Sequence, residues 1–289
     1  RDASMPQIVV DSVAKTRSGE VYSMADRESA KESLLATQDA LKIQAVGFTA
    51  DKLAVFMNDG ASDADKQAVM DASPVKAIEF FGELVDEMQN GPEMDDEENN
   101  AIAPRATATT LRGGNWARRS SGSNWSTITV SAVRNWNGSS GDIGFITCGH
   151  GWTNGQTVYA SDGAAVGTAD VRLYGNMDVC FVKLNNTALN SHGYMKDGAR
   201  ITKNASISNS DVGCSVKKYG ARLGTQNGTI RATGISGNWS GYYYNNLFLT
   251  SCYTQSGDSG GAFVINGDTI VGLMVGARSS SPHVGGTSS

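Results

Sequence analysis

The chain divides near residue 105 into two parts that differ in charge and in glycine content. Residues 1–105 hold 21 Asp and Glu against 10 Lys and Arg, a net charge of −11, and only 5 of the 34 glycines. Residues 106–289 hold 8 acidic and 14 basic residues, a net charge of +6, with 29 glycines, all five Trp and all four Cys. We therefore expect two units of different construction, and their opposite charges favour association between them.

The first part has the pattern of a small α/β unit. Apolar residues at helical spacing and short apolar runs predict two helices, 24–46 and 63–70, and two strands, 52–57 and 75–81. A turn signal, Asn58-Asp59-Gly60, separates the first strand from the second helix. A strand-helix-strand unit of this size needs a partner that covers its sheet.

Residues 90–105 are acidic, poor in large apolar residues and bounded by Pro92 and Pro104. Such a segment cannot bury enough surface to order itself, which predicts a linker open to proteolytic cleavage. The chain is thus divided into an acidic segment, 1–105, and a second domain, 106–289.

From residue 109 onward the pattern consists of short β-segments separated by Gly, Asn and Ser clusters. The spacing is typical of an all-β barrel or sandwich. The segments are 126–133, 142–147, 178–184, 213–218, 228–232, 247–252, 261–265 and 269–275.

Bulk properties exclude several classes of protein. No apolar run approaches the roughly 20 residues of a membrane helix, so no membrane association is expected. The basic residues are scattered, which argues against nucleic-acid binding. No signal peptide begins at Arg1, so a secreted protein would be presented here with its signal already removed.

The four cysteines are an even number in a Ser-, Gly- and Asn-rich chain, which fits two disulfides in an oxidising compartment, with four free buried thiols as the alternative. No CxxC pair occurs and the three His lie far apart in the sequence, so no metal site is expected.

The strongest local motif is Gly257-Asp258-Ser259-Gly260-Gly261. A nucleophilic serine needs an exposed hydroxyl and nearby N–H groups aimed at the developing oxyanion. Flanking glycines let the backbone turn tightly and approach a substrate. A glycine-rich hairpin turn with no chemical role is the alternative interpretation.

Two further side chains have the chemistry that such a serine requires. His150 follows an apolar strand, where a general base can reach into a cleft. Asp178 begins a strongly apolar strand and would be buried at a cost unless partnered, for example by a histidine that it orients. Taken singly, Asp178 also fits an ordinary turn aspartate, and His192 and His283 lie in loop-like sequence with no such context.

Together these residues resemble the chymotrypsin-like serine peptidases, and within them the bacterial alpha-lytic protease and streptogrisin branch. The order His150, Asp178, Ser259 matches chymotrypsin and differs from subtilisin and the α/β-hydrolases. The gaps of 28 and 81 residues are similar to those of the bacterial branch. Residues 216–230 resemble one of its glycine-spaced hairpins, residues 111–114 resemble the start of its mature enzymes, and the α/β unit resembles its pro-regions.

The resemblance implies an all-β fold of two antiparallel β-barrels preceded by a small α/β pro-domain. It implies a secreted, extracellular serine endopeptidase precursor that acts on peptide or protein substrates as a monomer, without cofactor or metal. Ser259 would be the nucleophile, His150 the general base and Asp178 the residue that orients it. The N–H groups of Gly257 and Ser259 would form the oxyanion hole. Asp258 would stabilise that loop through a buried ion pair with Lys218, which stands where relatives have an arginine.

The chain departs from the family pattern in several places. Gly151 stands where a half-cystine usually follows the catalytic His. The resemblance therefore suggests that Cys148 and Cys180 meet behind the triad and form a disulfide, with Cys214 and Cys252 as a possible second pair. Val275 replaces a serine that normally helps to hold the catalytic Asp. The chain also ends 30 residues after Ser259, where relatives continue, so the domain is expected to be truncated or closed differently.

The expected specificity pocket is lined by residues of two stretches that contain no acid. This argues against Arg or Lys before the scissile bond and favours small or medium apolar side chains, in agreement with a pro-segment cut near Ala108-Thr109. The lining residues are Tyr253, Thr254, Met274, Val275, Gly276 and Ala277.

Two other functions remain open at this stage. A protease fold without activity that serves as a binding protein would account for Val275 and the early end of the chain. A carbohydrate-binding or adhesin module would use aromatic side chains for sugar stacking. The candidates for that role are Trp239, Tyr242, Tyr243 and Tyr244.

Overall fold

The structure is a computed structural model. It describes residues 14–15, 21–85, 111–119, 125–134, 141–161, 163–174, 177–239, 241–278 and 286–287. The linker expected over 90–105, the cut expected near Ala108-Thr109, and His283 lie outside the described residues.

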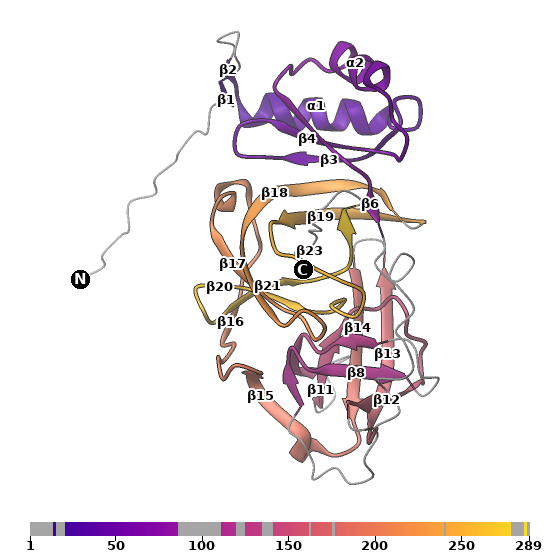
Figure 1. Ribbon diagram of the computed structural model, residues 1–289, viewed down its shortest axis with the longest axis vertical. Helices are drawn as coiled ribbons and strands as arrows, with labels where there is room; N and C mark the ends of the chain where they lie inside the picture. The colour runs from indigo at the N-terminus through magenta and orange to yellow at the C-terminus, as the bar shows by residue number, and fades with distance from the viewer. Residues whose placement is uncertain are drawn as a thin grey trace, which may run out of the picture.

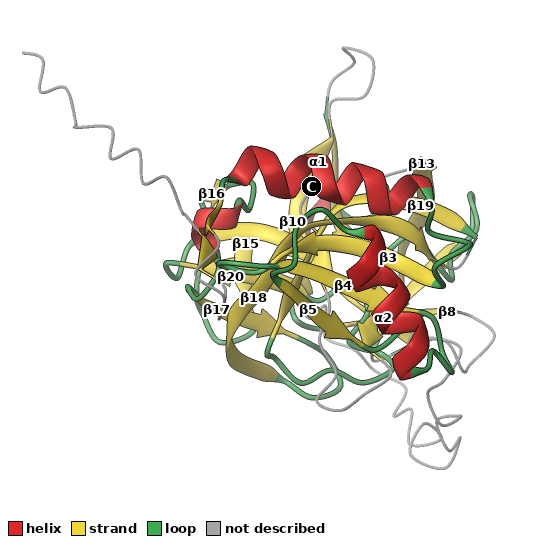
Figure 2. Ribbon diagram, turned by 90° about the horizontal axis from the view of Figure 1, so that it is seen from above, coloured by secondary structure: helices red, strands yellow, loops and turns green. Residues whose placement is uncertain are grey.

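The N-terminal unit is a three-stranded sheet covered on one face by two helices (Figure 2). Strand β4 pairs with β3 antiparallel and with β5 parallel, and α2 forms the crossover between β4 and β5. The elements are α1 (Met24–Ala36), β3 (Ile43–Phe48), β4 (Leu53–Met57), α2 (Asp63–Ala72) and β5 (Ile78–Phe81).

Both helices begin at a capping box, which satisfies backbone N–H groups that the first turn leaves free. Ser23 accepts from the amide of Asp26 at the start of α1, and the Asp26 carboxylate accepts from the Ser23 amide in return. Ser62 and Asp65 repeat the arrangement at the start of α2. The local sequence therefore sets where each helix begins.

The helix expected over 24–46 is wrong in its second half. The helix ends at Ala36, a turn follows in which Lys42 has φ 54°, and residues 43–48 form strand β3. Of the apolar positions that fit a helical period, Leu34 and Leu35 lie in α1, Leu41 lies in the turn, and Ala45 belongs to a strand that is buried on both faces. Ile43 and Val46 pack toward the helices, whereas Ala45 packs on the opposite side.

The first half of the second domain is a seven-stranded antiparallel sheet that curls on itself. The end strands of its order, β10-β11-β14-β13-β12-β8-β9, follow each other in the chain after a two-residue step, which brings the two edges together. The strands are β8 (Trp116–Arg119), β9 (Trp125–Thr127), β10 (Val130–Arg134), β11 (Asp142–Thr147), β12 (Thr157–Ala160), β13 (Ala165–Tyr174) and β14 (Met177–Leu184).

The second half closes into a ring of strands in the order β17-β20-β21-β23-β19-β18, because β18 also pairs with β17. Every pairing in this ring is antiparallel. The strands are β17 (Ser215–Tyr219), β18 (Thr225–Trp239), β19 (Tyr242–Thr250), β20 (Ala262–Ile265), β21 (Thr269–Leu273) and β23 (Gly286–Thr287). The expected all-β architecture of two antiparallel barrels after a small α/β unit is thereby confirmed (Figure 1).

Short elements connect these bodies. Strand β7 pairs with β15, which leads from the first barrel to the second, and β6 pairs with β22. The short strands are β1 (Ala14–Lys15), β2 (Val21–Tyr22), β6 (Leu84–Val85), β7 (Leu111–Gly113), β15 (Asn190–Met195), β16 (Lys203–Asn204) and β22 (Ala277–Arg278), and the 3-10 turns are Thr187–Leu189 and Asn209–Asp211.

The N-terminal unit continues the sheet of the second barrel. Strand β3 lies antiparallel to β18, so that the sheet grows to ten strands (Figure 1). The approach is close, because a Cβ added to Gly237 would lie 2.5 Å from the Cα of Ala45. The face of the sheet opposite the helices joins an apolar core with residues of both barrels. The core comprises Ala45, Ala54, Phe56, Phe81, Leu84, Cys148, Ala232, Ile235, Tyr244, Leu247, Leu249, Leu273 and Val275.

No described helix has the length and apolar character that crossing a membrane requires.

Candidate active site

Asp178 and His150 come together at one end of the first barrel. Thr147, the last residue of β11, lies opposite Cys180 of β14, so Asp178 lies beside the segment that follows β11. Its Oδ1 accepts hydrogen bonds from the amides of Gly149 (2.8 Å) and His150 (2.6 Å), and its Oδ2 contacts His150 Nδ1. The carboxylate is almost fully buried, and these three donors offset the cost of burying it.

The surroundings of His150 favour the protonated imidazole. Burial alone lowers the pKa of His150, but interactions with the neighbouring Cys148 thiol and Asp178 carboxylate outweigh it, and the pKa is raised well above its usual value. A ring held by a carboxylate at Nδ1 presents its other nitrogen, Nε2, for proton transfer.

Ser259 lies in the loop between β19 and β20, close to the start of the segment after β11 that carries His150. Its carbonyl accepts from the Thr127 amide at 2.7 Å. A Cβ added to the next residue, Gly260, would lie 2.8 Å from the Cys148 amide nitrogen, and Gly260 has φ 85°. Both the collision and the positive φ exclude a side chain at Gly260. The glycine therefore allows the Ser259 loop to lie close to the segment that carries His150.

The two atoms expected to react are both without a partner. Ser259 Oγ and His150 Nε2 are buried, and neither has a hydrogen-bond partner within the described part of the chain. Ser259 as a whole has no exposed surface. The structure thus joins His150 to Asp178 directly and brings the Ser259 loop beside them, without a hydrogen bond between Ser259 and His150.

Two amides near Ser259 are free to bind an anion. Residues 255–258 form a turn in which the Asp258 amide donates to Gln255 O at 2.9 Å, and Gly257 within it has φ 96°. Among the residues that the structure describes, neither the Gly257 nor the Ser259 amide donates to a protein acceptor. Unpaired N–H groups beside a nucleophile are the donors that an oxyanion requires.

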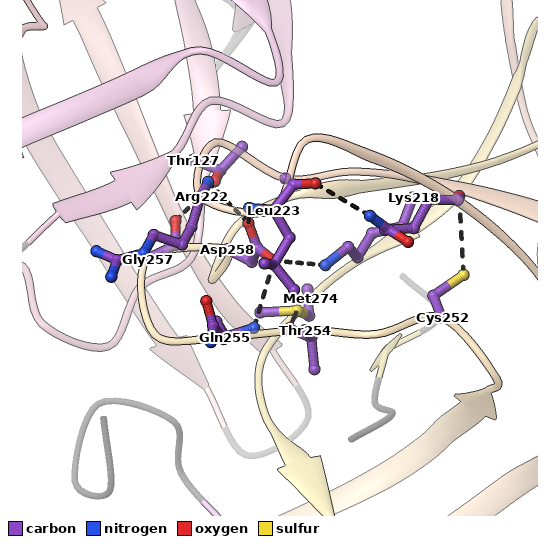
Figure 3. A network of polar contacts seen from close by, with 12 residues as sticks. Thr127, Lys218, Arg222, Leu223, Cys252, Thr254, Gln255, Gly257, Asp258 and Met274 are labelled. Carbon is purple, nitrogen blue, oxygen red and sulfur yellow. Dashed lines mark hydrogen bonds and ion pairs between the residues drawn. The ribbon is translucent and has the colours of Figure 1, made fainter. Parts of the chain in front are cut away.

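Asp258 turns into the second barrel and meets Lys218 (Figure 3). Lys218 Nζ lies 2.5 Å from Asp258 Oδ2, and both side chains are fully buried. The other carboxylate oxygen, Oδ1, accepts from the amides of Arg222 (2.9 Å) and Leu223 (3.1 Å). Gln255 N donates to Oδ2 at 3.3 Å, so the carboxylate fixes the turn that precedes Ser259.

The residues expected to line the pocket differ in their surroundings. Thr254 and Met274 are buried, and the Thr254 hydroxyl contacts the Met274 sulfur (Figure 3). Val275 and Gly276 are also buried, whereas Tyr253 is 56% exposed. The backbone of Ala277 pairs with Val85 of the N-terminal unit.

The expected disulfides are not confirmed: the four cysteines are free thiols in this structure. Cys148 and Cys180 are both buried, but they pack into different apolar clusters, one shared with the N-terminal unit and one inside the first barrel. Cys252 is buried in the second barrel, whereas Cys214 is exposed. Burial raises the pKa of Cys180, and the nearby Cys148 raises it further, which keeps the Cys180 thiol protonated.

Sequence reasoning missed two residues that shape this region. Gln44 of β3 bonds both backbone groups of Leu84, donating to its carbonyl at 2.8 Å and accepting from its amide at 2.6 Å. Lys196 donates to Gly220 O at 2.5 Å from the segment between the barrels. Neither has a local signal in the sequence, because each acts on a residue at least 24 positions away.

No family model matches the sequence. Among solved structures, the chain is similar to Nocardiopsis protease, with 22% identity, 62% of this chain and 91% of that chain covered, and a TM-score of 0.50. It is also similar to a glutamic acid-specific serine protease, with 23% identity, 62% and 93% covered, and a TM-score of 0.51. These likenesses show that the chain has the chymotrypsin-like fold.

Proposed function

We propose that the chain is the precursor of a secreted serine endopeptidase, with His150, Asp178 and Ser259 as its triad. The observation that carries this proposal is the buried His150–Asp178 pair beside a serine hydroxyl without a partner. The fold supports it, since one of the two proteins compared above is a protease and the other is a serine protease.

The reaction follows from these positions. Ser259 Oγ attacks the substrate carbonyl while His150 Nε2 takes its proton, and Asp178 stabilises the imidazolium that forms. The Gly257 and Ser259 amides receive the negative oxygen of the tetrahedral intermediate. His150 then protonates the leaving amine, and a water molecule hydrolyses the acyl-enzyme by the same route in reverse. No step requires a metal or a cofactor.

Covalent labelling tests this function. The chain is expressed in full, incubated until the N-terminal segment is cleaved, and treated with a sulfonyl fluoride. We expect one adduct, located by mass spectrometry on the peptide that contains Ser259. It should be lost in Ser259→Ala and kept in Ser208→Ala, which removes an exposed serine.

The same experiment separates the enzyme from its principal alternative. A protease fold that only binds other proteins has no activated serine, and Ser259 would react no faster than Ser208. That outcome would overturn the proposal.

For the substrate, we propose a small or medium apolar side chain before the scissile bond. The contact between Thr254 and Met274 supports a shallow apolar site without a charged wall. A panel of chromogenic peptides tests this: cleavage after Ala, Leu or Met should be the fastest. Faster cleavage after Arg or Glu would contradict it.

The N-terminal unit, within residues 1–105, is proposed to be a pro-segment that assists folding and blocks the active site. Its strand β6 pairs with β22, which begins at Ala277 of the expected pocket wall, and peptides commonly bind proteins by adding a strand to a sheet edge. The complete burial of Ser259 supports a closed precursor. The opposite net charges of the two parts add a long-range attraction.

A further inference from the structure

We infer that Lys196, in the segment between the two barrels, is a positioning residue for the oxyanion-binding loop. This inference rests on the proposed function, because it concerns how the Gly257 and Ser259 amides are held during catalysis. Lys196 acts through the turn around Gly220, which encloses the Asp258 carboxylate.

The first step of the argument is the dependence of the loop on Asp258. The carboxylate is fully buried, and both of its oxygens accept hydrogen bonds. Oδ2 receives Lys218 and the Gln255 amide, the latter inside the turn that ends at Asp258 itself. A shift of Asp258 therefore moves Gly257 and Ser259 on either side of it.

The second step is the tight enclosure of Asp258 Oδ1 by the turn that follows β17. Gly220 donates to Gly224 O at 3.0 Å and closes this turn. Within the turn, the Arg222 and Leu223 amides donate to Oδ1. A Cβ added to Gly220 would collide with the carboxylate. The position of Gly220 thus decides where the carboxylate can lie (Figure 3 shows the Asp258 end of this contact).

The third step is the anchor of Gly220. Its carbonyl accepts from Lys196 Nζ at 2.5 Å. The backbone of Lys196 is itself fixed, since its amide donates to Gly113 O at 2.9 Å. Its methylenes pack on Gly114, where an added Cβ would lie 2.9 Å from Lys196 Cδ. Lys196 therefore ties the turn to strand β7 and the first barrel.

Charge gives Lys196 a second effect on Asp258. Burial lowers the pKa of Lys196, the Asp258 carboxylate raises it, and the Lys218 ammonium lowers it again. The three groups thus act on one another electrostatically. Lys218 offers a single point charge, without the planar fork of five donors that an arginine would supply. Lys196 adds a second positive charge and a further donor, so two lysines share the stabilisation of one loop.

The test compares Lys196→Met with Lys203→Met. The first removes the ammonium and retains an unbranched side chain, and the second makes the same change at an exposed lysine that pairs with Asp268 on the surface. Each full chain is allowed to process itself, and active sites are counted by titration. We expect Lys196→Met to lower kcat about tenfold, less than the hundredfold or more that loss of an oxyanion donor itself costs. KM should stay within about twofold.

A second readout separates positioning from a general structural role. The affinity for a peptide aldehyde, which mimics the tetrahedral intermediate, should weaken by the same factor as kcat/KM. Lys196→Arg, which retains charge and a donor, should recover most of kcat. If Lys196→Met does not fold, Lys196→Gln is measured in the same assays, with the same expected results.

Suppose that the wild type is active and that Lys196→Met leaves kcat unchanged or only raises KM. That result would overturn this inference and leave the proposed function intact. Absence of turnover and of serine labelling in the wild type would overturn both. Lys203→Met should match the wild type, and an equal loss in this control would also overturn the inference.

Discussion

At the scale of single residues, Asp178 shows how the fold makes a buried charge tolerable and useful. Two backbone amides and the His150 ring surround its carboxylate. The amides of Gly149 and His150 supply the two backbone donors. The raised pKa of His150 follows from this environment, in which the effects of Cys148 and Asp178 outweigh burial.

Replacing Asp178 with Asn tests that environment. We expect kcat to fall about 10⁴-fold, because the amide no longer selects the tautomer that exposes Nε2 as a base. The general base must be neutral to accept a proton, so kcat/KM of the wild type should rise as pH increases through the raised pKa. Without the carboxylate the imidazolium loses a stabilising charge, and this limb should move to lower pH. The measurement is the pH profile of kcat/KM.

Asp142→Asn is the matched control, because Asp142 pairs with Lys183 near the surface at 2.7 Å. It should leave the profile unchanged. Activity of Asp178→Asn within tenfold of the wild type would contradict the assigned role.

At the scale of elements, the sequence predicted those segments whose pattern is local. Strand β11 has the expected bounds, and α2 and β4 differ from the expectation by two residues or fewer. The sequence predicts a helix where β3 begins, because Ala45 continues the helical spacing of Leu34, Leu35 and Leu41. It pairs on one edge with β4, the next strand in the chain, and on the other with β18, more than 180 residues later. The sequence of β3 does not alternate between apolar and polar residues, because both faces of the strand are buried.

At the scale of the whole molecule, one sheet unites the N-terminal unit with the second barrel. Pairing of β3 with β18 and of β6 with β22 joins them along the backbone, and the shared apolar core lies between. Gln44 links the two contacts, since it lies in β3 and bonds both backbone groups of Leu84 in β6. Strand β6, which pairs with β22 beside the expected pocket, is therefore held in place by β3 of the N-terminal unit.

Replacing Gln44 with Ala should weaken this hold. The Leu84 amide and carbonyl lose their partners while buried, which costs about 1–3 kcal/mol, or roughly a 5- to 160-fold loss of affinity. The measurement is inhibition of the processed enzyme by the N-terminal segment, residues 1–105, added as a separate chain. Gln67→Ala, which changes an exposed glutamine of α2, is the control.

An unchanged inhibition constant for Gln44→Ala would contradict the role proposed for Gln44 in holding β6. Inhibition should also weaken at higher salt, since part of the attraction is between net charges of opposite sign. A complex insensitive to salt would argue that the apolar core alone holds the two parts together.

The sequence alone predicts the all-β character of the second part and the candidate chemistry of His150, Asp178 and Ser259, and its charge and glycine content predict a division near residue 105. These follow from composition, from periodicity and from short motifs, all of which are local. The tertiary structure is needed to show that the thiols are unpaired, that residues 43–48 form a strand, and that Gln44 and Lys196 bond Leu84 and Gly220. The physical reason is that each of these depends on a neighbour far away in the sequence. Such residues come within contact distance of one another only when the chain has folded into its barrels.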